Sequence, residues 1–579
     1  MFKGPALTTY FVIFVLVALV AGLASGRLSS VKLFSLALAA LYFTGVVSPE
    51  VVLSKATNMG LITLLVLILA SIGLEKLTLL GTLANRLLHA NLSFSILRLG
   101  LVTAVSSAFV NNTAVVATLA GAVQRNTLHR PSKLLIVLSY AAIMGGTMTL
   151  IGTSTNLIVN SFLIDAGFEG FAFFDFLPIG GLAAIAGLVT LIVFVRNLPS
   201  NTTHDKPITD YLVEAEVSAG SKLIGRSVAE NGLRDLDGLF LVEIARDGRL
   251  ITPVTPSEVL VESDKLIFSG DVGRIHVLDR FDGLKLFATE EGLLRSNLTE
   301  VIVLPGATVE GRSIKTSGFR SLFDAAVVGV SRGGLPLSGK LGDTVLKAGD
   351  SLMLAVGPDF RRRNNLRRNF VVIDSEIDSG RASGPQDYGM LLGLFLVVVA
   401  AAMEWISLLT GFAFLLGVML LTGTLSGQDL RRRFPFDIWL IITSALCVSQ
   451  VVADTGLIDA GIHSLTANVG SIEPWVALAV IYLVTLLMTE LMTNTAAAAL
   501  AFPLAASVAQ SMGLDVAPFA AAVAFGASAS FLTPFGYTTN LMVQNMGGYR
   551  LNDYVRIGLP VSVVYSAVAI IMIPRVFPF

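Results

Sequence analysis

Two sets of long apolar segments flank a more polar middle region in this chain. A membrane-spanning helix needs about 20 mostly apolar residues, and each set contains five segments that approach or exceed this length. Residues 205–375 between the sets are rich in charges and hold short alternating stretches such as DKLIFSG, a pattern that predicts half-buried strands. The predicted spans lie near residues 8–25, 31–48, 57–74, 132–164 and 172–195, and near 386–403, 406–425, 436–453, 517–546 and 556–576.

The composition supports a polytopic α-helical membrane protein. Hydrophobic residues make up 54% of the 579-residue chain and charged residues only 14%, with a mean hydropathy of +0.76, whereas about a quarter of the residues of a soluble protein are charged. The single cysteine, Cys447, lies in an apolar segment, which excludes an intrachain disulfide or a cysteine metal cluster. Because the five histidines form no cluster in the sequence either, we predict that the chain is not an enzyme. We also expect no organic cofactor and no nucleic-acid partner.

Basic residues in the connecting loops predict the orientation of the chain. Loops that contain QRNTLHRPSK, RRRNNLRR, GQDLRRRFPF and GGYRLNDYVR are rich in Arg and Lys, whereas those with IDAGFEGFAFFD and VADTGLIDAG are acidic. Since short basic loops stay on the cytoplasmic side, we expect ten crossings of the cell (inner) membrane. Both termini would lie outside and the polar insert in the cytoplasm.

Two further apolar segments, residues 92–124 and 473–511, are each about twice too long for one crossing but must return to the side they left. A re-entrant hairpin of two helices meets both conditions. Its turn would hold a polar group of residues, Asn111-Asn112-Thr113 in the first hairpin and Thr493-Asn494-Thr495 in the second. Non-helical backbone at membrane depth is tolerated only where it is buried or lines a watery cavity. These residues therefore either cap the helix ends or form a binding site.

A polar, glycine-containing break follows each hairpin inside the next apolar span. Asn156 in GTSTN comes 44 residues after Asn112, and Asn540 in GYTTN comes 46 residues after Asn494. The chain thus repeats one unit, in opposite predicted orientation. Inverted repeats with broken helices are typical of secondary transporters that bind substrate at the membrane midplane. Helix N-termini at the breaks favour an anion, while free carbonyl, Asn and Thr oxygens suit Na⁺.

Together, these four motifs resemble the paired Ser-Asn-Thr and Gly-Thr-Pro-Pro-Asn type signatures of the divalent anion/sodium symporter family. The resemblance covers the membrane portion, although Asn111 and Thr493 replace the usual serines and both breaks lack the prolines. The run GYTTNLMVQNMGGYR is closer to the sulfate-permease-like branch than to the di- and tricarboxylate branch. The resemblance implies an elevator mechanism in a homodimer, with sodium-coupled uptake of a divalent anion, most of all sulfate.

Site residues follow from the same resemblance, and the neutral oxygens that it selects suit a hard cation. No Arg or Lys lies within a few residues of either tip, so an anion there would depend on helix dipoles, amides and co-bound Na⁺. The first sodium site would use Ser107, Asn111, Asn112 and Gly152, and the second Thr489, Thr493, Asn494 and Gly536. The substrate would contact Asn111, Asn112, Thr113, Thr493, Asn494, Thr495 and Thr538.

Glu490, beside Thr489 on the second hairpin, is the candidate proton site. A carboxylate within the membrane is a functional candidate by default, so this group could replace a cation with H⁺. The alternative is a carboxylate paired with a neighbour or placed at the interface, and the sequence leaves both open. It also leaves open a di- or tricarboxylate or another oxyanion as substrate. An ion channel is less favoured, because we find no filter repeat such as T-V-G-Y-G.

The insert repeats itself at an offset of 86 residues. Gly225-Arg226-Ser227 recurs as Gly311-Arg312-Ser313, and Asp264 recurs as Asp350. This constancy predicts two tandem copies of one small α+β domain, which resembles the TrkA C-terminal (RCK-C) domain. The resemblance implies regulation through dimer contacts or a small cytoplasmic ligand, and the absence of G-x-G-x-x-G gives no reason to expect NAD. The predicted domains are residues 1–204 and 376–579 for the membrane repeats and 205–290 and 291–375 for the inserted copies.

Overall fold

The computed structural model places the predicted membrane spans as helices. Five stretches among the described residues are long and apolar enough to cross a membrane. They are residues 49–73 and the helices α10 (Leu177–Phe194), α16 (Phe436–Asp454), α18 (Pro474–Leu491) and α22 (Leu551–Val576). By length and composition, these helices agree with the prediction of a polytopic helical membrane protein. The structure describes the chain except residues 1–4, 26–27, 76–86, 125, 127, 195–211, 234–235, 237–238, 248, 271–276, 279, 288–297, 305–306, 333–334, 338–340, 358, 361–362, 364, 373–384, 404 and 457–472.

The helices of the two membrane repeats occur in the same order. Residues 1–204 contain α1 (Pro5–Ser25), α2 (Ser30–Phe43), α3 (Pro49–Ala56), α4 (Met59–Glu75), α6 (Leu92–Ser107), α7 (Asn112–Gln124), the 3₁₀ turn η1 (Pro131–Lys133), α8 (Leu135–Gly146), α9 (Ser154–Asp165) and α10 (Leu177–Phe194). Residues 376–579 contain α13 (Pro385–Ala402), α14 (Leu408–Leu421), α15 (Gly427–Arg433), α16 (Phe436–Asp454), α18 (Pro474–Leu491), α19 (Asn494–Ser511), α20 (Ala517–Ser528), α21 (Thr538–Gly547) and α22 (Leu551–Val576).

Two short helices, α3 and α15, were not predicted. Each follows a helix that ends in Thr-Gly, where Gly45 and Gly423 adopt positive φ angles of 77° and 72°. Ser48 and Ser426 then cap the short helix by accepting a backbone N–H bond. The apolar-length rule misses such elements because they have only 8 and 7 residues and carry charges.

Both over-long apolar segments form pairs of helices in contact, and both interrupted spans form two helices with a break. In the first repeat, α6 and α7 form the pair, and the break between α8 and α9 covers residues 147–153. In the second, α18 and α19 form the pair, and the break between α20 and α21 covers residues 529–537. The turns of the pairs fall at the predicted polar residues.

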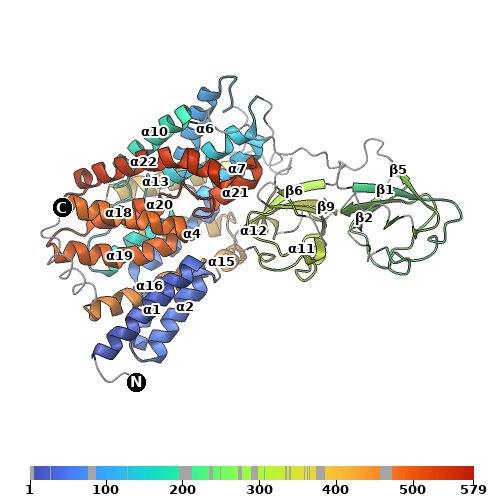
Figure 1. Ribbon diagram of the computed structural model, residues 1–579. Helices are drawn as coiled ribbons and strands as arrows, with labels where there is room; N and C mark the ends of the chain where they lie inside the picture. Colours follow the sequence, from blue (N-terminus) through green and yellow to red (C-terminus); the bar gives the residue numbers. More distant parts are fainter. Residues whose placement is uncertain are drawn as a thin grey trace.

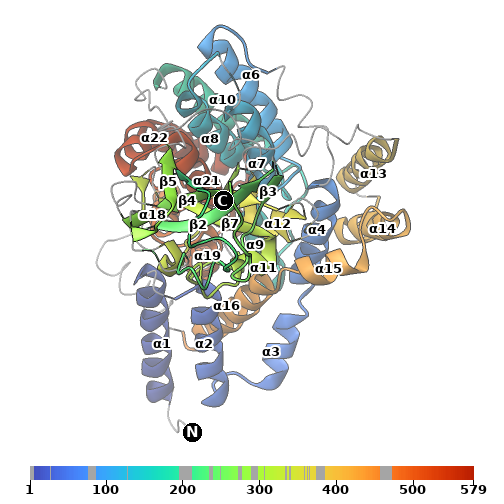
Figure 2. The same cartoon turned by 90° about the vertical axis from the view of Figure 1, so that its right-hand side faces the viewer.

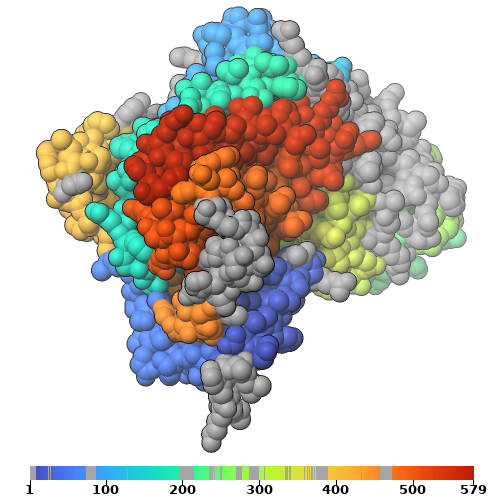
Figure 3. Space-filling view, turned by 60° about the vertical axis from the view of Figure 1, so that its left-hand side comes forward, coloured from blue at the N-terminus to red at the C-terminus, as the bar shows by residue number. Residues whose placement is uncertain are grey.

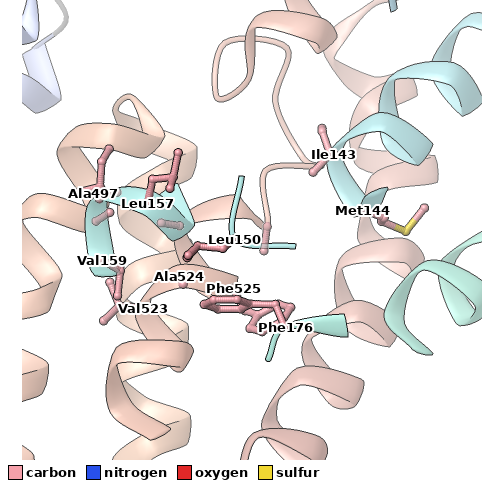
Figure 4. Packing of buried hydrophobic residues seen from close by; sticks show 14 of the residues in the cluster. Ile143, Met144, Leu150, Leu157, Val159, Phe176, Ala497, Val523, Ala524 and Phe525 are labelled. Atoms are coloured by element: carbon pink, nitrogen blue, oxygen red, sulfur yellow. The ribbon is translucent and has the colours of Figure 1, made fainter. Parts of the chain in front are cut away.

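The two repeats pack into one apolar core. Helix α9 packs against α19 and α20, and α21 packs against α7 and α8. Helices α10 and α22, also from different repeats, run side by side across one face (Figures 1 and 3). Around the breaks, Phe176 of the first repeat lies 5.7 Å from Phe525 of the second between ring centroids, near Leu150 and Ala524 (Figure 4).

The insert contains two five-stranded antiparallel sheets that extend from one end of the helical part (Figure 1). The strand orders, β3-β2-β4-β1-β5 and β8-β7-β9-β6-β10, describe one topology used twice, with every strand start offset by 86 residues. The basic helix α15 lies at the same end (Figures 1 and 2). The strands are β1 (Leu212–Val217), β2 (Leu239–Arg246), β3 (Arg249–Ile251), β4 (Lys265–Gly270), β5 (Leu284–Phe287), β6 (Leu298–Val303), β7 (Ala325–Arg332), β8 (Leu335–Pro336), β9 (Ser351–Val356) and β10 (Phe370–Val372), with the short helices α11 (Phe319–Phe323), η5 (Leu341–Asp343) and α12 (Leu366–Asn369) in the second copy.

The second copy of the insert also contacts the membrane helices. Ile302 in β6 is only 1% exposed and belongs to the same apolar cluster as the helices, with Leu304 packed beside it. A Cβ atom added to Gly349 would lie 3.0 Å from Leu541 Cγ in α21. The insert therefore touches the helix that follows the second break.

Candidate functional site

The two helix-pair tips make the same side-chain contact. Ser107 Oγ donates a hydrogen bond to Asn112 Oδ1 in the first repeat. Five residues apart in the same way, Thr489 Oγ1 and Asn494 Oδ1 lie 3.4 Å apart in the second. Ser107, Asn112 and Thr489 are buried, and Asn494 is half-buried. Each tip thus places a hydroxyl oxygen and an amide oxygen together.

Matching hydrogen bonds stabilise the non-helical backbone of the two breaks. In the first, Gly152 N–H donates to Thr149 Oγ1 (3.2 Å) and Asn156 Nδ2 donates to the Thr149 carbonyl (2.9 Å). These bonds satisfy backbone groups that would otherwise be costly at membrane depth. The second break repeats them, with Gly536 N–H on Thr533 Oγ1 (3.2 Å) and Asn540 Nδ2 on the Thr533 carbonyl (3.3 Å) and on the Ser530 carbonyl (2.9 Å).

The predicted glycines lie where oxygen atoms approach the backbone closely. A Cβ atom on Gly152 would lie 2.5 Å from the Gly146 carbonyl oxygen. On Gly536 it would lie 1.9 Å from Ser530 Oγ and 3.1 Å from the Thr489 carbonyl oxygen. Side chains at these positions would collide with those oxygens, so glycine permits the approach. Thr489 and Gly536, predicted to share one sodium site, are adjacent in the structure.

Tyr537 joins the two repeats and was not among the predicted site residues. Asn112 Nδ2 donates to the Tyr537 hydroxyl (2.6 Å), which also lies 3.2 Å from Thr153 Oγ1. Tyr537 and Thr153 are the N-cap residues of α21 and α9, and Asn112 is the first residue of α7. Three helix N-termini therefore meet at one phenol. The sequence signal that could have indicated this residue is the second break motif, GYTTN, which has Tyr537 where the first motif, GTSTN, has Thr153.

The remaining predicted residues lie around these contacts. The Asn111 side chain is exposed, and its Oδ1 accepts the Thr113 N–H (2.9 Å). The Thr493 side chain is also exposed; its Oγ1 accepts the Ala496 N–H (3.4 Å) and lies 3.3 Å from Ser30 Oγ of α2. Both residues thus cap the helices that follow them. Thr113, Thr495 and Thr538 are half-buried in the first turns of α7, α19 and α21.

Glu490 points into the second break. Its Oε1 accepts the backbone N–H groups of Phe531 (2.9 Å) and Leu532 (2.8 Å), and its Oε2 accepts the Thr533 hydroxyl (2.8 Å). Three donors of this kind stabilise a carboxylate that is out of bulk water. The geometry supports the reading of Glu490 as a carboxylate paired with its neighbours.

Comparison with known proteins gives similarity over nearly the whole chain. A family model described as a citrate transporter matches residues 12–526. A putative sulfur deprivation response regulator of Chlamydomonas reinhardtii is 33% identical over 506 residues, or 82% of this chain and 85% of that protein. An uncharacterized transporter of Synechocystis sp. is 28% identical over 562 residues, or 92% of this chain and 91% of that protein. A probable sodium/sulfate cotransporter of C. reinhardtii is 29% identical over 384 residues, or 63% of this chain and 42% of that protein.

Proposed function

The chain belongs to the citrate transporter family, and we propose that it is a secondary active transporter that couples Na⁺ entry to the uptake of sulfate. The observation that carries this proposal is the duplicated arrangement of tip and break. Each repeat brings a hydroxyl and an amide oxygen, Ser107 with Asn112 and Thr489 with Asn494, to the end of a helix pair. Oxygen ligands of this kind suit a hard cation.

The anion would bind between the two tips. The Tyr537 contacts bring together the N-termini of α7, α9 and α21, and Gly536 brings α21 close to the second tip at Thr489. Helix N-termini present free N–H groups and a partial positive charge, which stabilise an anion. With Na⁺ bound beside it, the anion would be held more tightly, so the two would be taken up together.

Sulfate is favoured over larger anions for two reasons. Several relatives are named as sodium/sulfate cotransporters. In addition, Asn112 of the first tip reaches Tyr537 of the second break directly across the repeats, so a compact tetrahedral ion would fit beside the donors that meet there. The second candidate is a di- or tricarboxylate, because the matching family model is described as a citrate transporter. Proton coupling through Glu490 is the less favoured form of either function.

We infer that transport proceeds by an elevator movement in a homodimer, as the symporter resemblance implies. The helix pairs and broken helices would move as one body against α4. Contact there is close, since a Cβ atom on Gly60 would lie 2.6 Å from Ser161 Cα of α9. Lys55 Nζ of α3 also lies 2.8 Å from Asp165 Oδ2 at the end of α9. This ion pair would break during the movement.

The insert would regulate this movement from the cytoplasm. Its two copies share the topology described above, which supports the TrkA-C-like reading, and a small cytoplasmic ligand or a dimer contact would act on them. The contact of Gly349 with Leu541 provides a physical route to the second break. A ligand that changes the conformation of the second copy would thereby change the relative free energies of the positions that α21 takes during transport.

Uptake of radiolabelled sulfate into proteoliposomes tests the proposal. We expect uptake under an inward Na⁺ gradient, little uptake under an equal K⁺ gradient, and competition by unlabelled sulfate at lower concentration than by succinate or citrate. Stronger competition by succinate or citrate would assign the chain to carboxylate transport. Equal uptake with Na⁺ and K⁺ would exclude sodium coupling.

A further inference from the structure

The two candidate cation sites differ at two structurally equivalent positions. The breaks align at an offset of 384 residues, which pairs Gly152 with Gly536 and Gly146 with Ser530. The tips align at an offset of 382 residues, which pairs Asn112 with Asn494 and Ala108 with Glu490. The second repeat therefore has a hydroxyl and a carboxylate where the first repeat has neither.

Ser530 places an oxygen atom at the second site. Its side chain is fully buried, and within the described part of the chain its Oγ has no hydrogen-bond partner. This oxygen lies against Gly536, on the side where the Thr489 carbonyl oxygen also approaches. A buried hydroxyl without a partner is unfavourable, and a cation would satisfy it.

Glu490 replaces backbone hydrogen bonds that the second break lacks. Helix α8 ends at Gly146, whereas α20 ends at Ser528, two residues earlier in the alignment. In the first repeat, the N–H groups of residues 147 and 148 donate to the carbonyls of residues 144 and 145. The equivalent N–H groups of Phe531 and Leu532 donate to Glu490 instead.

The early end of α20 leaves Ser530 outside the helix, at the start of the break. Glu490 holds the next two residues in place, and it also holds Thr533 through its hydroxyl. The orientation of Ser530 toward Gly536 thus depends on Glu490, whose carboxylate bonds Phe531, Leu532 and Thr533 rather than the glycine. In the first repeat, the Thr149 hydroxyl makes the corresponding bond to the Ala108 carbonyl.

We propose that Ser530 Oγ is an additional ligand of the second sodium site and that Glu490 is its positioning residue. The second site would then bind Na⁺ more tightly than the first, which has Gly146 and Ala108 at these positions. This inference rests on the proposed sodium-coupled transport. It gives Ser530 a role in coupling, and it makes Glu490 a fixed carboxylate rather than a proton carrier.

The first test is Ser530→Ala, with Ser444→Ala as its matched control. The Ser444 hydroxyl in α16 is equally buried and likewise has no hydrogen-bond partner among the residues that the structure describes. Two readouts are used: Na⁺ activation of sulfate uptake, and the rise in Tm of the purified full chain when NaCl replaces KCl. Loss of one ligand to a charged group predicts an increase of about tenfold in half-saturating Na⁺ for Ser530→Ala. The control should match the wild type.

The second test compares Glu490→Ala with Glu490→Gln. Glutamine keeps an oxygen for both backbone N–H groups, and its amide can donate to the Thr533 hydroxyl. We therefore expect Glu490→Ala to raise half-saturating Na⁺ as Ser530→Ala does, and Glu490→Gln to remain near the wild type with an unchanged pH profile. Glu473→Ala, at the exposed start of the same helix, is the control.

The outcomes separate this inference from the proposed function. A wild-type protein without Na⁺ stabilisation or Na⁺-driven uptake would overturn both. Normal sodium behaviour in the wild type with unchanged half-saturation in Ser530→Ala would overturn the ligand assignment alone. A reduced maximal rate with unchanged half-saturation in Glu490→Ala, or a flattened pH profile in Glu490→Gln, would overturn the positioning role.

Discussion

The contact between the insert and α21 leads to a prediction about how the insert regulates transport. The substitution that tests it is Ile302→Glu. Ile302 faces the membrane helices from β6, whereas its neighbours Val301 and Val303 face the core of the small domain. The first copy has Glu216 at the equivalent position, 86 residues earlier. Glutamate is therefore compatible with this strand, and the substitution makes the second copy resemble the first where they differ.

The magnitude follows from the burial of Ile302, which is 1% exposed. Full burial of such a side chain contributes about 1.5–3 kcal/mol, so its loss would weaken the contact by about tenfold to a hundredfold. This is a lower bound, because a buried carboxylate without a partner would be opposed further. The small domain itself should keep its stability, since its own core is unchanged.

Hydrogen exchange of the full chain measures the prediction. We expect faster exchange in residues 341–357 and in α21. We also expect a sulfate uptake rate that differs from that of the wild type, because the insert would no longer act on α21. Val345→Glu is the control, because Val345 lies in the same copy and is 47% exposed. If exchange in α21 and the uptake rate both match the wild type while the insert stays folded, regulation through this contact is refuted.

Three further predictions follow from the site and the insert. Asn112→Ala and Asn494→Ala should each reduce Na⁺ activation and sulfate uptake together, and normal Na⁺ dependence in both variants would contradict the cation assignment. Tyr537→Phe removes the acceptor for Asn112 Nδ2, so we expect sulfate KM to rise about fivefold to tenfold, whereas an unchanged KM would show that the hydroxyl is dispensable. Hydrogen bonding to buried Asp350 raises the pKa of Arg332, so the guanidinium stays charged at assay pH. Arg332→Met removes the partner of a buried carboxylate but leaves the site partly open to water, so it should destabilise the second copy by about 2 kcal/mol, seen as a lower Tm by calorimetry; an unchanged Tm would contradict this.

Much of the architecture was determined by the sequence itself, because apolar length and strand alternation are local properties. The long membrane helices, the turns of both helix pairs, the breaks near Gly152 and Gly536, and strands such as β4 in DKLIFSG lie where these patterns predict them. The family motifs also selected Ser107 with Asn112 and Thr489 with Asn494, pairs that the structure brings into contact. The two members of each pair are only five residues apart, on either side of the turn between two helices, so their contact is local and can be anticipated from the sequence.

Tertiary structure alone decided the contacts between the repeats and inside the second break. Asn112 and Tyr537 are 425 residues apart in the chain, and no periodicity links them. The partners of Glu490 depend on α20 ending two residues before its counterpart, which neither hydropathy nor spacing indicates. Ser530 was likewise missed, because a serine in an alanine-rich span looks like an ordinary small residue. Ser530 becomes buried against Gly536 only when the second break packs onto the second tip. At that point the hydrogen bonding of the backbone outweighs the helix preference of the residues around Ser530.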